Sequence, residues 1–132
     1  MIALKQFALA FALFIAADYV WLSAIASKLY TENLGKLLRL GADGKMQAII
    51  PSALLVYVAL AAGVAYFILP KASGPASAAL VGAAFGAITY AVYELTNHAL
   101  VSGWPLKIVI VDILWGTVLT AAVSAAVAYA IR

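Results

Sequence analysis

The chain has 132 residues, of which 67% are hydrophobic and only 10% are charged, whereas a soluble domain is about half apolar and about a quarter charged. One domain is the most that this length allows, and the apolar excess is far larger than a single core could bury, so it must face lipid. The formal charge of +3 comes from scattered Lys and Arg residues, which argues against nucleic-acid binding. No cysteine is present, so disulfides and thiolate metal sites are excluded.

Four segments are long and apolar enough to cross a bilayer core, which needs roughly 20 predominantly apolar residues in one helix. Short stretches rich in Gly, Pro and Ser separate the later segments, as expected for helix breakers. The sequence therefore predicts an all-α fold, a four-transmembrane-helix bundle that forms one transmembrane domain over residues 1–132. The predicted spans run from Leu4 to Ala26, from Gln47 to Leu69, from Pro75 to Asn97 and from Leu106 to Ile131.

The first predicted span also carries the three parts of a secretory signal. Lys5 precedes an apolar run, and the small residues Ala24 and Ala26 follow it, as in a cleavable leader. Asp18 and Trp21 interrupt the region in which cleavage would occur. We therefore expect this segment to remain as a membrane span.

The connection from Ser27 to Lys45 is the only sizeable polar segment of the sequence. Leucines alternate there with charged residues, a pattern typical of a short amphipathic helix in the lipid headgroup region. A solvated loop is the alternative. The alternating residues are Lys28, Leu29, Glu32, Leu34, Lys36, Leu37, Leu38, Arg39 and Leu40.

Four spans place the first and third connections on one side of the membrane, and both termini with the second connection on the other. The first side carries five basic residues and the second side carries three. Basic residues favour the cytoplasm, so these counts favour termini on the outer side. The difference is small, and the sequence leaves either orientation open.

Small residues recur at every fourth position in the third and fourth predicted spans. In lipid, such stripes let two helix backbones approach each other closely. We therefore expect these helices to pack tightly, either within one chain or across a dimer. The stripes are Gly74, Ala78, Gly82 and Gly86 in one span, and Gly116, Thr120, Ser124 and Ala128 in the other.

Three acids, Asp18, Glu94 and Asp112, lie inside the predicted spans. An ionisable group there costs several kcal/mol, roughly 2.5 to 3.5 for Asp, unless it finds a partner or water. Asp18 and Glu94 come late in spans one and three, while Asp112 comes early in span four, so chain direction places all three in one leaflet. Glu94 and Asp112 continue the small-residue stripes, and we therefore expect the acids to point into the bundle.

Aromatic and amide side chains surround these acids in the sequence. Trp21 and Trp115 each follow an acid by three residues, which puts the acid and the indole on one helical face. An N–H-to-carboxylate bond or an aromatic pocket wall would result. Trp104 is interpreted as part of the aromatic belt at the membrane boundary. The other candidates for the site are Tyr90, Tyr93 and Asn97.

Three functions and one structural role are compatible with this cluster. Carboxyl groups held together in low dielectric can carry a proton or bind an organic cation, as in a small carrier. A divalent metal held by Glu94, His98 and Asp112 is a weaker alternative, and acid–base chemistry on a lipid or isoprenoid is another. The structural role is a polar clamp between helices, worth about 0.6 to 2 kcal/mol per bond.

Four sequence blocks carry a resemblance to a known family. They are Asp18-x-x-Trp21-Leu22, Tyr90-x-x-Tyr93-Glu94-Leu95-Thr96-Asn97, Trp104-Pro105-Leu106 and Asp112-x-x-Trp115-Gly116-Thr117. In this order they resemble a family of small bacterial inner-membrane proteins, the domain-of-unknown-function family numbered 2177, over nearly the whole chain. The resemblance implies a four-span protein of the bacterial inner membrane and brings no settled activity.

The sequence thus predicts a membrane protein whose acidic and aromatic pocket binds a small cationic or lipid-derived ligand, as a proton-linked carrier or a binding protein. A membrane enzyme acting on a lipid or isoprenoid and a purely structural protein remain the alternatives, and no catalytic residue is identified. Neither a cofactor nor nucleic acid is expected. The lipid bilayer is the expected surrounding, and a homodimer is the expected assembly because four short helices enclose little volume.

Overall fold

Four long apolar helices form the protein, whose structure is a computed structural model that describes residues 1–131. Each of the four is long and apolar enough to cross a membrane, which confirms the predicted fold class. The elements are α1 (Ile2–Val20) with η1 (Trp21–Ile25), α2 (Ser27–Leu34) with η2 (Gly35–Leu37), α3 (Ile50–Gly63) with η3 (Val64–Ile68) and η4 (Leu69–Lys71), α4 (Pro75–Leu100), and α5 (Leu106–Ala130).

Two helix ends differ from the ends predicted from hydropathy. The second membrane helix begins at Ile50, three residues after the predicted Gln47, because Pro51 lies in its first turn and has no N–H to lose there. The helix α4 continues to Leu100, beyond the predicted end at Asn97. The short helix α2 confirms that a helix lies between the first two spans.

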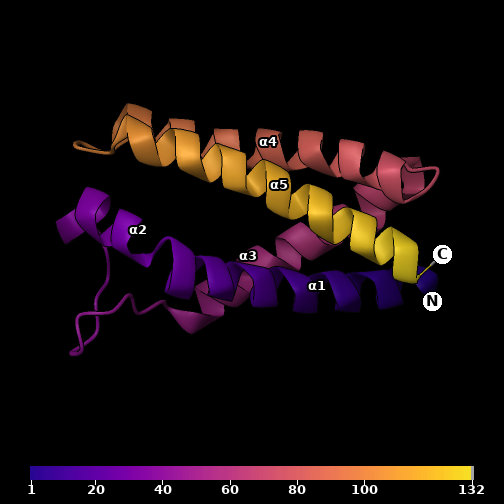
Figure 1. Ribbon diagram of the computed structural model, residues 1–132, viewed down its shortest axis with the longest axis horizontal. Coiled ribbons are helices and arrows are strands. Elements are labelled where there is room, and N and C mark those ends of the chain that lie inside the picture. Colours follow the sequence, from indigo (N-terminus) through magenta and orange to yellow (C-terminus); the bar gives the residue numbers. More distant parts are fainter. Residues whose placement is uncertain (132) are drawn as a thin grey trace.

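The helices form two pairs that cross each other (Figure 1). The helices α4 and α5 run side by side, and α1 crosses α3 below them. Both termini and the α3–α4 connection lie at one end of the bundle, whereas α2 and the α4–α5 turn lie at the other end. At the terminal end, the Gln6 amide donates a hydrogen bond to the carbonyl oxygen of Ile131 at 3.3 Å.

Part of the predicted stripes of small residues forms the contact between α4 and α5, whereas Gly74, the first residue of its stripe, has open space at its Cβ position. A Cβ atom on Gly86 would lie 2.3 Å from the carbonyl oxygen of Gly116, and one on Gly82 would lie 2.6 Å from Ser124 Oγ. A Cβ atom on Gly116 would meet the ring of Tyr90 at 2.2 Å. The close packing predicted for these two helices is therefore formed within one chain, and it requires glycine at these positions.

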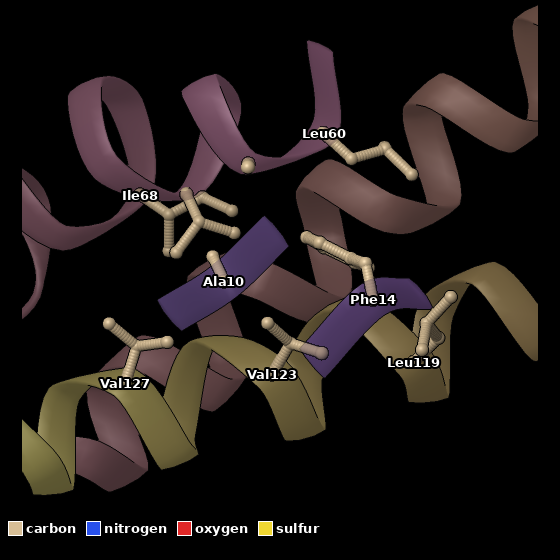
Figure 2. Packing of buried hydrophobic residues seen from close by; sticks show 9 residues of the cluster. Ala10, Phe14, Leu60, Ile68, Leu119, Val123 and Val127 are labelled. Carbon is tan, nitrogen blue, oxygen red and sulfur yellow. The ribbon is translucent and has the colours of Figure 1, made fainter. Parts of the chain in front are cut away.

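Buried apolar side chains join α1, α3 and α5 in the middle of the bundle (Figure 2). Phe14 of α1 is fully buried and packs in the same cluster as Leu119 of α5. Asp18 lies one helical turn beyond Phe14, and Trp115 lies one turn before Leu119. The apolar core therefore ends where the acidic cluster begins.

Candidate functional site

Asp18 connects three helices through its two carboxylate oxygens. Its Oδ2 atom accepts a hydrogen bond from the Tyr57 hydroxyl of α3, and its Oδ1 atom accepts one from Trp115 Nε1 of α5 at 2.9 Å. Asp18 itself lies near the end of α1. Both donors are uncharged, so the carboxylate is solvated by dipoles and receives no compensating positive charge from them.

Asp112, in the second turn of α5, accepts a hydrogen bond from the Tyr30 hydroxyl of α2. The same hydroxyl accepts a hydrogen bond from Trp21 Nε1 at 3.2 Å. Burial of Tyr30, together with its bond to Asp112, raises the pKa of this phenol above its usual range. Tyr30 is therefore a neutral donor at every physiological pH.

Stacked indole rings connect the surroundings of the two aspartates. The rings of Trp21 and Trp115 have centroids 4.4 Å apart and planes within 6° of each other. Trp21 donates toward Tyr30, which binds Asp112, and Trp115 donates to Asp18. Trp115 forms an N–H-to-carboxylate bond as expected, but with Asp18 of α1 and not with Asp112 on its own helix, and Trp21 donates to Tyr30 instead of to Asp18.

Glu94 of α4 is fully buried between the helices. Its Oε1 atom accepts a hydrogen bond from Trp104 Nε1 at 2.8 Å, while its Oε2 atom has no hydrogen-bond partner among the residues that the structure describes. The nearby Asp112 interacts electrostatically with this carboxyl group. Two carboxylates at close range repel each other unless one holds a proton or a cation lies between them.

A pocket of about 180 Å³ opens beside the two aspartates. Acidic, aromatic and aliphatic side chains from α1, α2, α4 and α5, and from the connections next to them, line it together. The lining consists of Asp18, Leu22, Tyr30, Leu34, Leu38, Met46, Tyr90, Tyr93, Trp104, Asp112 and Trp115. The pocket lies at the end of the bundle that carries the first and third connections.

No basic side chain lines this pocket. Within residues 1–131, the one salt bridge joins Lys28 to Glu32 at 3.8 Å, on the exposed face of α2. The acids of the cluster therefore have tyrosine and tryptophan partners but no lysine, arginine or histidine at ion-pair distance. Ionisable residues inside membrane proteins commonly face the bundle interior or a cavity, as Asp18 and Asp112 do here.

The structure distributes the predicted site residues unequally. Five of the eight line the pocket, namely Asp18, Tyr90, Tyr93, Asp112 and Trp115. Trp21 is outside the lining and stacks on Trp115, which lines the pocket. Glu94 is also outside the lining and is buried near Asp112. Asn97 is outside the lining and interacts with the side chain of Tyr93, one turn earlier on the same helix.

Trp104, interpreted from the sequence as part of the aromatic belt, also makes contacts inside the bundle. Its indole N–H binds Glu94, its ring meets Tyr93 edge to face at 6.4 Å, and it lines the pocket. Sequence reasoning also missed Tyr30 and Tyr57. Tyr57 sits in an apolar span with no acid near it in the sequence, so its only signal is a hydroxyl that must find a partner in lipid.

The weaker alternative of a metal held by Glu94, His98 and Asp112 has no supporting geometry. The imidazole of His98 is exposed, and its Nδ1 atom is 3.0 Å from the carbonyl oxygen of Trp104. Across residues 1–131, no three His, Cys, Asp or Glu side chains gather as a metal ligand set.

The comparison with known proteins agrees with this architecture. No curated protein and no solved structure matches the chain significantly. A family model described as "Predicted membrane protein (DUF2177)" matches residues 3–129, which confirms the family resemblance inferred from the sequence blocks. The match covers nearly the whole length, and the chain belongs to this family of predicted membrane proteins.

Proposed function

We propose that this membrane protein binds a small organic cation, an alkylammonium group, in the pocket between Asp18 and Asp112. The observation that carries the proposal is the absence of any basic side chain from the pocket lining, although two carboxyl groups contribute to it. An alkylammonium ion supplies the missing positive charge. The same chemistry is present in a free amine and in the cationic headgroup of a lipid.

The aromatic side chains of the pocket suit this ligand class. Trp104, Trp115, Tyr90 and Tyr93 all line the pocket, and the face of an aromatic ring attracts a cation by about 0.5 to 2 kcal/mol. The carboxylates add attraction, which is stronger between helices than in water because the dielectric is lower. Charge and ring faces together favour a cation over a neutral molecule of the same shape.

The size of the pocket limits the ligand. Pockets for drug-sized molecules measure about 300 to 1,000 Å³, whereas this pocket measures about 180 Å³. The ligand therefore has few heavy atoms inside the pocket. A tetramethylammonium ion, or the ammonium end of a lipid whose tails stay in the bilayer, meets this limit.

Exchange of the bound cation for a proton would make this site a proton-linked carrier. When the cation leaves, Asp18, Asp112 and the nearby Glu94 keep only uncharged hydrogen-bond donors. A proton taken up by one of these acids removes the repulsion between them. Cation and proton then occupy the site alternately, which is the requirement for coupled exchange.

Calorimetric titration of the purified protein with tetramethylammonium tests the proposal. Wild type is expected to bind this ion and not tert-butanol, a neutral molecule of similar shape. Asp18→Asn and Asp112→Asn each weaken binding at least about tenfold, because each removes one negative charge while keeping the side-chain size. The same titration in vesicles with and without phosphatidylethanolamine distinguishes the two sources of the ammonium group. Weaker tetramethylammonium binding in the presence of this lipid indicates a lipid headgroup as the ligand, and equal binding indicates a free amine.

The second candidate is a purely structural clamp, which is favoured by the bonds of Asp18 to both α3 and α5. Under this alternative, Asp18→Asn lowers the thermal stability and tetramethylammonium binds to neither protein. Binding by wild type that is lost in a variant of unchanged melting temperature excludes the clamp as the sole role. Release of a product from membrane lipid would instead select a membrane enzyme.

The bacterial inner membrane as the location and a homodimer as the assembly are part of the same proposal. The location is supported by the family resemblance of the sequence blocks, and the homodimer is supported by the small volume that four helices enclose. Native mass spectrometry from inner-membrane preparations measures both, and a monomer would contradict the second.

A further inference from the structure

Part of the pocket wall comes from outside the membrane helices. Tyr30 and Leu34 of α2, and Leu38 and Met46 from the chain that follows it, line the pocket together with the aspartates. Figure 1 shows α2 at the end of the bundle, next to the turn between α4 and α5. The connection between the first two spans therefore covers the pocket at that end.

This covering segment is attached to the bundle at few points. The backbone leaves helical geometry at Ala26, with φ −107° and ψ 1°, and it turns at Gly35, which has a φ of +50°. The side-chain hydrogen bonds of Thr31 and Asn33 stay within α2. In the described part of the chain, Tyr30 alone joins α2 to another span through side-chain hydrogen bonds.

The remaining attachment is apolar. Tyr30 and Leu34 pack in one cluster with Ala26 and with Ile108 of α5. Further partly buried side chains pack against this cluster, namely Trp21, Leu22, Leu29, Leu38, Met46 and Trp104. The opposite side of the segment is hydrophilic, with Lys28 and Glu32 paired on the exposed face. The segment thus has one inward side that touches the pocket and one outward side that stays in water or among headgroups.

The attachment point is itself the binding site proposed above. The Tyr30 hydroxyl donates to Asp112, one of the two carboxylates assigned to the cation. The Tyr30 hydroxyl donates a hydrogen bond to the Asp112 carboxylate, and an incoming ammonium group is attracted to the same carboxylate by its positive charge. An alkylammonium ion that approaches Asp112 closely must therefore weaken or replace the bond from Tyr30.

We infer that residues 26–46 form a lid over the pocket, that the Tyr30 hydroxyl is its latch, and that the cation opens the lid by competing with Tyr30 for Asp112. This inference rests on the proposed cation binding and adds how access to that site is controlled. The phenol remains protonated, so the latch does not release by titration of Tyr30 in the physiological range.

The absence of cysteine from the sequence allows the lid to be followed by labelling one introduced cysteine. The buried Leu34→Cys reports on lid opening through its rate of reaction with a maleimide. Adding Tyr30→Phe to this variant removes the latch, and the rate is expected to rise about tenfold, as expected for a hydrogen bond to a charged acceptor. Adding Tyr57→Phe instead is the matched control, since it removes an identical hydroxyl from Asp18 but lies on α3; here the rate stays within about twofold.

Tetramethylammonium provides the second measurement, in the Leu34→Cys protein with Tyr30 intact. Saturating ion is expected to raise the labelling rate. Tyr30→Phe is expected to bind the ion several-fold more tightly, because the hydroxyl that competes with the ion for Asp112 is gone.

Equal labelling rates in the Tyr30→Phe and Tyr57→Phe variants would overturn the latch. If Tyr30→Phe does not fold, an unchanged labelling rate with bound ion overturns the inference. Failure of wild type to bind the ion contradicts the proposed function instead, and the ligand-free comparison of the two tyrosine variants still decides the latch.

Discussion

Glu94 is a buried carboxyl group with few hydrogen-bond donors around it. Its carboxyl is fully buried, and among the residues that the structure describes only Trp104 is seen to donate a hydrogen bond to it, at Oε1. A buried polar group that loses its last partner costs about 1 to 3 kcal/mol, and more if it is charged. The contribution of Trp104 is therefore measurable as stability.

Trp104→Phe is predicted to lower the free energy of unfolding by about 1 to 3 kcal/mol, because it removes the N–H donor to the buried Glu94 carboxyl group. Unfolding in SDS, followed by circular dichroism, measures the change. The double variant Trp104→Phe with Glu94→Met is the control, since it removes both partners and should recover most of the loss. A single variant as stable as wild type would show that Glu94 does not depend on this bond.

The acids and most of their aromatic neighbours could be predicted from the sequence, because an ionisable residue in an apolar span is conspicuous by its cost. Tyr30, Tyr57 and Trp104 could not. Each lies in another element than the acid it binds, and one sequence does not specify which helices are neighbours. Tyr30 in particular lies in the polar connection, where a tyrosine gives no sign of pointing inward.

The geometry of the acidic cluster depends on the close approach of the helices α4 and α5. This approach sets the position of Glu94 against Asp112, one to two turns from the glycine contacts. The glycines are needed because the nearest atoms include backbone, which cannot move aside as a flexible side chain would.

Gly86→Ala is predicted to destabilise the bundle by about 1 to 3 kcal/mol, since its Cβ would lie 2.3 Å from the carbonyl oxygen of Gly116 and overpacking costs about that much. Gly74→Ala is the matched control. Gly74 has open space around the Cβ position and an extended backbone with φ 168°, so its substitution should change stability by less than about 0.5 kcal/mol. SDS-induced unfolding of both variants decides the comparison, and equal effects would contradict the proposed tight α4–α5 contact.

The number and type of the membrane helices could be predicted because length and hydropathy specify them. Their internal irregularities could not. Trp21–Ile25 and Val64–Ile68 are π-helical, a rare geometry that often marks functional sites. Nothing in the residue pattern distinguishes these turns from ordinary helix.

For the whole molecule, exposed apolar side chains cover the outside of the bundle. Leu80 and Ile88 of α4 and Leu114 and Val118 of α5 are each more than half exposed, on the faces opposite the stripes of small residues. Such a surface is suited to acyl chains. The lipid-facing side chains are thus apolar, and the acids of the proposed cation site lie on the inner side of the same helices.

Coupled exchange is predicted in proteoliposomes that contain the purified protein. Vesicles whose interior is one pH unit more acidic than the medium should accumulate labelled tetramethylammonium about tenfold, because protons leave down their gradient as the ion enters and one unit corresponds to a factor of ten. This ion has no proton to lose, so it cannot accumulate passively as a weak base does. Nigericin, which collapses the pH difference, and Asp112→Asn should each abolish uptake, and uptake that ignores the pH difference would contradict coupling.

A crystal structure with tetramethylarsonium, an organic cation whose arsenic atom scatters anomalously, tests whether a cation lies between Asp18 and Asp112. One anomalous peak is expected in the pocket, beside the rings of Trp104 and Trp115, and it should disappear in Asp112→Asn crystals. An empty pocket in crystals soaked well above the measured dissociation constant, or a peak only on the outer surface, would contradict the account.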